Sequence, residues 1–178
     1  EAAKIAKLYT PRERAKKLLT LINSILKPQI VEIVALETGH ASEVYLAGGD
    51  RVLEKMARFF PKNYKLKIIA PNFGIKHWRD SGLQIEECLL PPNPFDNKTH
   101  PVQIFIAYLI RIWQSFFVLR KLKANIILSS TNVLPDIIPA FLAKITQPNI
   151  PWIARIHHLI PPPNLRPGNK LVNLVSYL

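Results

Sequence analysis

Hydrophobic positions along the chain form short apolar runs that alternate with stretches of helical spacing. The apolar runs are 30–37, 64–70, 83–90, 124–130 and 150–156. Between and after them, apolar residues recur every three or four positions over 50–60, 101–123, 135–146 and 169–178. Short apolar runs are typical of strands covered on both faces, and the longer spaced pattern is typical of helices. Alternating strands and helices predict an α/β fold with a Rossmann-like parallel sheet and helices on both faces.

The first residues lie outside this alternation. Residues 1–27 are expected to be helical with a break near Thr10, a capping residue type, and Pro11, which suits the first helical position. They carry seven basic and two acidic side chains, a net charge of +5. We therefore expect a basic helical extension over 1–29 and a Rossmann-like domain over 30–178. The pattern stops partway through its last element, so we expect a truncated domain.

Composition limits the kinds of partner and site. The 178 residues, 48% of them hydrophobic, suffice for one domain with its own core. The single cysteine, Cys88, excludes an internal disulfide and a multi-cysteine metal site, and buried packing is its expected role. The net charge of +12 favours an anionic partner: a phospholipid surface, a nucleotide or a nucleic acid. Nucleic acid is the weakest of these, because no zinc-finger spacing or RNP-like strand accompanies the charge.

The segment 101–119 is apolar enough to require a membrane test. Arg111 lies near its middle, and Gln103, Ala107, Gln114 and Lys121 fall on the same narrow stripe. A helix packed against the sheet explains this pattern best. A helix lying on a membrane surface is the second interpretation, since a basic end with Trp and Phe suits that position, and a true span is the third.

A glycine pair precedes the first helix of the α/β pattern. Gly48-Gly49-Asp50 follow a buried strand and a loop, and the helix expected after them would direct its positive end toward a ligand. The pair matches neither GxGxxG nor GxxxxGK[ST], which speaks against an ordinary dinucleotide or P-loop site. The alternative is a plain turn in which Asp50 caps the helix.

Two further groups follow strands on the same predicted edge. His157 and His158 come directly after 150–156. One interpretation is that they contact a phosphate or a sugar hydroxyl of a ligand, and the other is that they bond within the surrounding loop. Ser129, Ser130, Thr131 and Asn132 follow 124–130 and could bind a polar ligand or cap the next helix, in which Asp136 would compensate the dipole. Neither group has the spacing of a metal site, so no metal is expected.

Several of these segments together resemble a known family. They are Glu37–Asp50 with its late glycine pair, the helix at 51–60, the run 122–130 and the run 151–157. In their order and spacing they resemble the amino-terminal domain of a retaining GT-B glycosyltransferase of glycosyltransferase family 4. Such enzymes have two Rossmann-like domains: the first mainly takes the acceptor, and the second mainly takes the nucleotide-sugar. The resemblance implies that Gly48 and Gly49 approach the donor diphosphate, and that His157 lines the reaction centre, with His158 as the fallback.

The function that the resemblance implies is transfer of a sugar from a nucleoside-diphosphate donor to an acceptor, in cell-surface polysaccharide or glycolipid synthesis. The predicted substrate-binding residues are Gly48, Gly49, Asp50, Ser130, Thr131, Asn132 and His158, and the predicted catalytic residue is His157. No cofactor is expected beyond the donor substrate. The donor domain, with its paired glutamates, is absent, so the fragment alone is expected to be inactive. The expected location is cytoplasmic, with peripheral contact at the inner membrane face.

Two alternatives belong to other classes. The first is a non-catalytic, membrane-associated Rossmann-like subunit of a transferase made of two chains, which co-purification with a separate donor domain would support. The second is a nucleic-acid-binding module, motivated by charge alone, which salt-dependent binding to unrelated duplex would support.

Overall fold

Five parallel strands form the centre of the molecule. The computed structural model describes residues 10–25, 30–39, 48–98 and 100–156. Its strands follow the order β3-β2-β1-β4-β5 and all neighbours are parallel. Their bounds are β1 Val31–Leu36, β2 Tyr64–Ala70, β3 Glu86–Leu89, β4 Ile126–Ser129 and β5 Trp152–Ala154. The prediction of an α/β, Rossmann-like sheet is confirmed.

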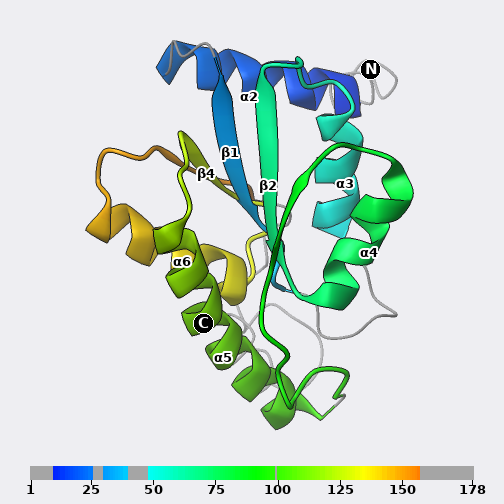
Figure 1. Cartoon of the computed structure of the whole chain (residues 1–178), viewed down its shortest axis with the longest axis vertical. Coiled ribbons are helices and arrows are strands. Elements are labelled where there is room, and N and C mark those ends of the chain that lie inside the picture. Colours follow the sequence, from blue (N-terminus) through cyan, green and yellow to red (C-terminus); the bar gives the residue numbers. More distant parts are fainter. Residues whose placement is uncertain (1–9, 26–29, 40–47, 99, 157–178) are drawn as a thin grey trace, which may run out of the picture.

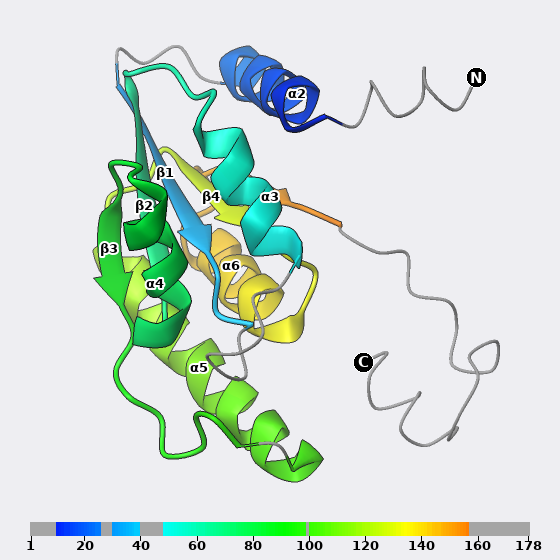
Figure 2. The ribbon, with the colours of Figure 1, turned by 90° about the vertical axis from the view of Figure 1, so that its right-hand side faces the viewer.

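Helices cover both faces of the sheet (Figures 1 and 2). The helices are α2 Pro11–Ile25, α3 Gly48–Ala57, α4 Asn72–Ser81, α5 Pro101–Lys121 and α6 Leu134–Thr146. One core joins one face of the sheet to α2, α3 and α4, and a second core joins the opposite face to α5 and α6. Residues of β1 alternate between the two cores, Ile33 and Ala35 in one and Val34 and Leu36 in the other. A strand buried on both faces is therefore apolar at nearly every position.

The basic helix α2 is part of the same folded unit. Ala15 and Ile22 are fully buried, and Ile22 belongs to the core shared with α3 and α4. The helix starts as the sequence predicts, since the Glu13 amide donates to Thr10 Oγ1 over 3.3 Å. At its far end, the Tyr64 hydroxyl of β2 and Asn23 Oδ1 lie 2.6 Å apart in a hydrogen bond. Residues 10–25 thus pack on the sheet, and 1–9 lie outside the described residues.

The spacing of apolar residues in the sequence did not predict helix α4. The stretch that forms α4 holds Gly74 and several polar residues, so its helical periodicity is weak. Its ends carry recognisable signals, because Pro71 occupies the N-cap and Gly82 ends the helix with a left-handed φ of 71°. Trp78 of α4 is completely buried and donates to Glu37 Oε2 over 2.6 Å, so it packs in the core.

Helix α5 packs on the domain with its polar stripe turned inward. It contacts α6 and β2, as the first of the three interpretations expects. Ala107 and Arg111 are buried, whereas the exposed positions up to Phe117 are all apolar. The predicted bounds of 101–123 and 135–146 are close to those of α5 and α6. The expected helix over 169–178 lies outside the described residues.

Candidate functional site

The sheet reverses its winding between β1 and β4. From β1 the chain continues through α3 to β2 on one side, and from β4 it continues through α6 to β5 on the other. The two connections leave on opposite faces of the sheet. In open α/β sheets, ligands bind outside the carboxyl ends of the strands at such a switch point. We refer to this edge, with the residues after β1 and β4 and the start of α3, as the carboxyl edge.

A buried carboxylate organises the carboxyl edge. Asp136, in the first turn of α6, has no exposed surface. Its Oδ1 accepts hydrogen bonds from the Thr38 amide at 2.7 Å and the Thr38 hydroxyl at 2.8 Å. Its Oδ2 accepts from the hydroxyls of Ser130, at 3.3 Å, and Thr131. The Asp136 carboxylate therefore ties the end of β1 and the end of β4 to the positive end of α6.

The predicted hydroxyl residues are thus used inside the protein. The Ser130 hydroxyl also lies 2.7 Å from the Leu36 carbonyl, and Ser129 Oγ lies 2.9 Å from the Asp136 carbonyl. Ser129, Ser130 and Thr131 are all buried. They do not cap α6 either, because its N-cap is Val133, which makes no side-chain cap hydrogen bond. These hydroxyls hydrogen-bond to Asp136 and so position it, while Asn132 is partly exposed beside them.

Helix α5 supplies the second polar group at this edge. Arg111 is 1% exposed and donates to the Thr38 carbonyl over 3.1 Å. Its other terminal nitrogen pairs with Asp96, and its guanidinium carbon lies 5.3 Å from the centre of the Phe73 ring. A guanidinium can be buried in this way because its fork of donors is satisfied by a carboxylate and a carbonyl.

The backbone after β1 is closely enclosed. The Tyr108 hydroxyl donates to the Gly39 carbonyl over 3.1 Å, and burial raises the pKa of the Tyr108 phenol. A Cβ atom at position 39 would lie 2.5 Å from Val133 Cγ2, so only glycine fits beside the start of α6. No local pattern singles out Gly39, Tyr108 or Asp96, because their partners are remote in the chain.

The glycine pair forms the first turn of α3. The helix begins at Gly48, two residues before the predicted 50–60, and ends at Ala57. Figure 2 shows α3 rising from the carboxyl edge, antiparallel to β1. The free amides of a helix start carry a partial positive charge, and glycine lets a ligand approach them. Gly48, Gly49 and the backbone of Asp50 therefore lie at the predicted edge, next to the switch point.

The residue after β5 extends the pairing of the sheet at this edge. Arg155, just after the strand, donates its amide to the Ser129 carbonyl over 3.2 Å and so continues the pairing with β4. The described chain ends at Ile156, and His157 and His158 lie outside the described residues, as do His40 and Glu43. Within the described parts of the chain, no three His, Cys, Asp or Glu side chains gather in a way that could hold a metal ion.

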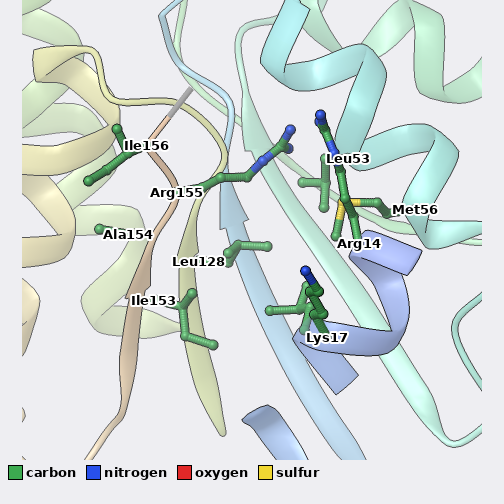
Figure 3. A pocket seen from close by; sticks show the side chains of 10 residues that line it. Arg14, Lys17, Leu53, Met56, Leu128, Ile153, Ala154, Arg155 and Ile156 are labelled. Carbon is green, nitrogen blue, oxygen red and sulfur yellow. The ribbon is translucent and has the colours of Figure 1, made fainter. Parts of the chain in front are cut away.

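A pocket of about 460 Å³ opens beside β5 (Figure 3). Its apolar wall comes from Leu53 and Met56 of α3 and from Leu128 and Ile153 of the sheet. Basic side chains also line it, from α2 and from the residue after β5: Arg14, Lys17 and Arg155. The sequence predicted the positive charge of α2 but not its place, because nothing in a local pattern says on which strands an added helix packs.

Cys88 lies in β3 with its side chain against the second core. Burial raises the pKa of its thiol, and Glu86 adds to the rise. A thiol held in its protonated form is a poor nucleophile, so the expectation of a packing role is confirmed.

Comparisons with known proteins give distant structural likenesses alone. No family model matches the chain, and no curated protein sequence matches it. A similar solved structure is the carboxyl-terminal domain of a hydrogenase from Pyrococcus furiosus, at 9% sequence identity and a TM-score of 0.42. The match covers 73% of this chain and 96% of that domain. A likeness at this level says nothing about what this chain binds.

Proposed function

We propose that this chain is the acceptor-side domain of a glycosyltransferase that moves a sugar from a nucleoside-diphosphate donor to an acceptor hydroxyl. The observation that carries the proposal is the start of α3, where Gly48 and Gly49 form the first turn at the carboxyl edge. Amides in that position suit the diphosphate of a donor, whose negative charge grows as the sugar leaves. The order and spacing of the motifs that resemble glycosyltransferase family 4 support the same function.

The buried network gives this proposal a physical basis. A site that stabilises a leaving diphosphate has to keep its dipoles fixed while the charge develops. Asp136 accepts hydrogen bonds from the amide and the hydroxyl of Thr38. Arg111 donates a hydrogen bond to the Thr38 carbonyl. The start of the segment that follows β1 is therefore fixed by hydrogen bonds at Thr38.

Transfer activity of the complete gene product, which contains this chain, tests the proposal. It is incubated with a panel of labelled nucleoside-diphosphate sugars and a cell-envelope extract, and release of the nucleoside diphosphate is followed. We expect one donor to be consumed, and we expect His157→Ala to lower kcat by about 100-fold or more, as for a group at a reaction centre. The matched control is His100→Ala, because His100 is exposed and makes no side-chain cap bond to α5.

Two results would count against the proposal. If no nucleotide-sugar in the panel is consumed, the activity is wrong. If a donor is consumed but His157→Ala behaves like His100→Ala, the activity stands and His157 is removed from the reaction centre.

A further inference from the structure

The outward ridge of α5 is apolar over most of its length. Every described position of α5 that is exposed before Arg120 carries a large hydrophobic side chain, each 44–58% exposed. They recur at spacings of three and four residues and so form one line along the helix: Val102, Phe105, Leu109, Trp113 and Phe117. We call these five residues the α5 ridge. At 1.5 Å per residue the ridge is about 22 Å long.

This arrangement reverses the usual one for a surface helix. The buried side of α5 carries Arg111 and Ser115 together with apolar residues, while three of the five ridge positions are aromatic. A soluble domain normally places its polar stripe outward. Contiguous exposed apolar surface of this kind marks an interaction site. Phe141 and Ile145 are also exposed on α6, the neighbouring helix of the same layer.

The charge around the ridge indicates what it meets. Over residues 96–156 the chain has seven basic side chains and two acidic ones, a net charge of +5. The acidic ones are Asp96, which pairs with Arg111, and Asp136, which is buried. Exposed basic residues lie at both ends of the ridge: Lys98 before it, and Arg120, Lys121 and Lys123 after it. Apolar and aromatic residues between basic ends match the apolar layer and anionic headgroups of a bilayer surface.

The same helix is unsuited to cross a bilayer. By length and composition alone, Val102–Lys121 could span one. Its inner side, however, packs against α6 and the sheet. Arg111 on that side forms an ion pair with Asp96 and a hydrogen bond to the Thr38 carbonyl. Insertion would have to break those contacts, whereas lying flat on the surface keeps them.

We propose that the α5 ridge docks this domain on an anionic phospholipid bilayer, with α5 parallel to the surface and the ridge in the acyl-headgroup boundary. Figure 2 shows that α5 runs past the carboxyl edge of the sheet. Docking by this helix therefore brings the carboxyl edge close to the headgroups. The proposal stands on the ridge and the charge, and is independent of the glycosyltransferase proposal.

Vesicle flotation tests the docking. The 178-residue chain is mixed with vesicles of phosphatidylcholine and phosphatidylglycerol, and with phosphatidylcholine alone. We expect flotation with the anionic vesicles and about tenfold weaker partitioning for the double variant Trp113→Gln, Phe117→Gln. The control is Phe59→Gln, because Phe59 is as exposed as Phe105 but follows α3 on the other face of the sheet. We expect it to bind within about twofold of the unsubstituted chain, since its ring does not meet the bilayer.

A second pair of variants tests the charge. Lys121→Gln with Lys123→Gln should lower binding to anionic vesicles and leave the weak binding to phosphatidylcholine unchanged, while Arg12→Gln with Lys16→Gln on α2 should lower it less. Trp113 emission, taken as the difference from Trp113→Phe, should shift to shorter wavelength with anionic vesicles.

The outcomes separate the possible occupants of the ridge. No flotation, or equal losses in the Phe59 and ridge variants, overturns the proposal. A concentration-dependent dimer that the ridge variants make monomeric, without flotation, would assign the ridge to a second copy of the chain and overturn it as well.

Discussion

At the scale of single residues, Asp136 is the group on which the carboxyl edge depends. Its carboxylate is buried and accepts hydrogen bonds from Thr38, Ser130 and Thr131. The sequence placed Ser130, Thr131 and Asp136 together, since they are neighbours in the chain. It could not predict that Thr38, which lies 98 residues away, contacts Asp136, because a local pattern does not specify that β1 and β4 are adjacent.

Removal of this carboxylate should destabilise the fold strongly. We expect Asp136→Ala to lower the free energy of unfolding by about 3 kcal/mol, because the Thr38 amide and the Thr131 hydroxyl lose their buried acceptor. The Thr38 and Ser130 hydroxyls keep the Pro135 and Leu36 carbonyls as acceptors. Urea denaturation followed by circular dichroism measures the change. The control is Asp80→Ala, an exposed carboxylate at the end of α4, expected within about 0.5 kcal/mol. Equal losses in the two variants would show that Asp136 has no special role.

Tyr108 should give the fold a dependence on alkaline pH. Its pKa is raised chiefly by burial; Arg111 acts in the opposite direction, and Asp136 adds to the rise. The folded state therefore holds the phenol proton more tightly than the unfolded chain, whose tyrosine pKa is about 10. The stability contributed by Tyr108 is fully present below about pH 10 and is lost as the pH rises through the raised pKa.

The stability difference between the unsubstituted chain and Tyr108→Phe isolates this effect. We expect a difference of about 1 kcal/mol near neutral pH, from the hydrogen bond to Gly39, and a smaller one at about pH 11. Denaturation at a series of pH values measures it. A difference that stays constant to about pH 11 would contradict the assignment.

At the scale of elements, periodicity predicted strands better than it predicted where helices face. The apolar runs located the five strands of the described residues. The signal is clearest for β1 and β4, because a strand covered on both faces has almost no polar position. The α4 helix was missed since its glycine and polar residues dilute the pattern. For α5 the pattern identified a polar stripe but not its direction, which is fixed by Asp96 and Thr38 on other segments.

The inward pairing of α5 can be measured by a double-mutant cycle. Arg111→Met alone should cost about 3 kcal/mol in unfolding free energy, because Asp96 loses its partner. Adding Asp96→Asn should recover part of that loss, with a coupling energy of about 1 kcal/mol or more. Additive losses would mean that the two side chains are not coupled.

The packing of α2 has an equally direct test in two adjacent residues. Ile22 is 1% exposed in the core, and Leu21 is 46% exposed on the same helix. We expect Ile22→Ala to lower the free energy of unfolding by about 3 kcal/mol and Leu21→Ala by about 0.5 kcal/mol or less. If both changes cost little, α2 does not belong to the folded unit.

At the scale of the whole molecule, the two faces of the sheet and its carboxyl edge have different tasks. One face packs α2, α3 and α4, the other carries α5 with its exposed ridge, and the carboxyl edge gathers the glycine turn of α3 and the end of β5. A domain docked through α5 would present that edge to a membrane-bound acceptor. The glycosyltransferase and docking proposals are therefore compatible, and each is tested separately.

The glycosyltransferase proposal requires the first turn of α3 to meet the diphosphate of a nucleotide-sugar. Titration of the ¹⁵N-labelled 178-residue chain with a nucleoside diphosphate, followed by amide chemical shifts, tests it even where binding is weak. We predict shifts of the Gly48 and Gly49 amides with the diphosphate and none with the nucleoside, together with loss of these shifts in Gly49→Val. Unmoved Gly48 and Gly49 amides at saturating diphosphate, or equal shifts with the nucleoside, would contradict the account.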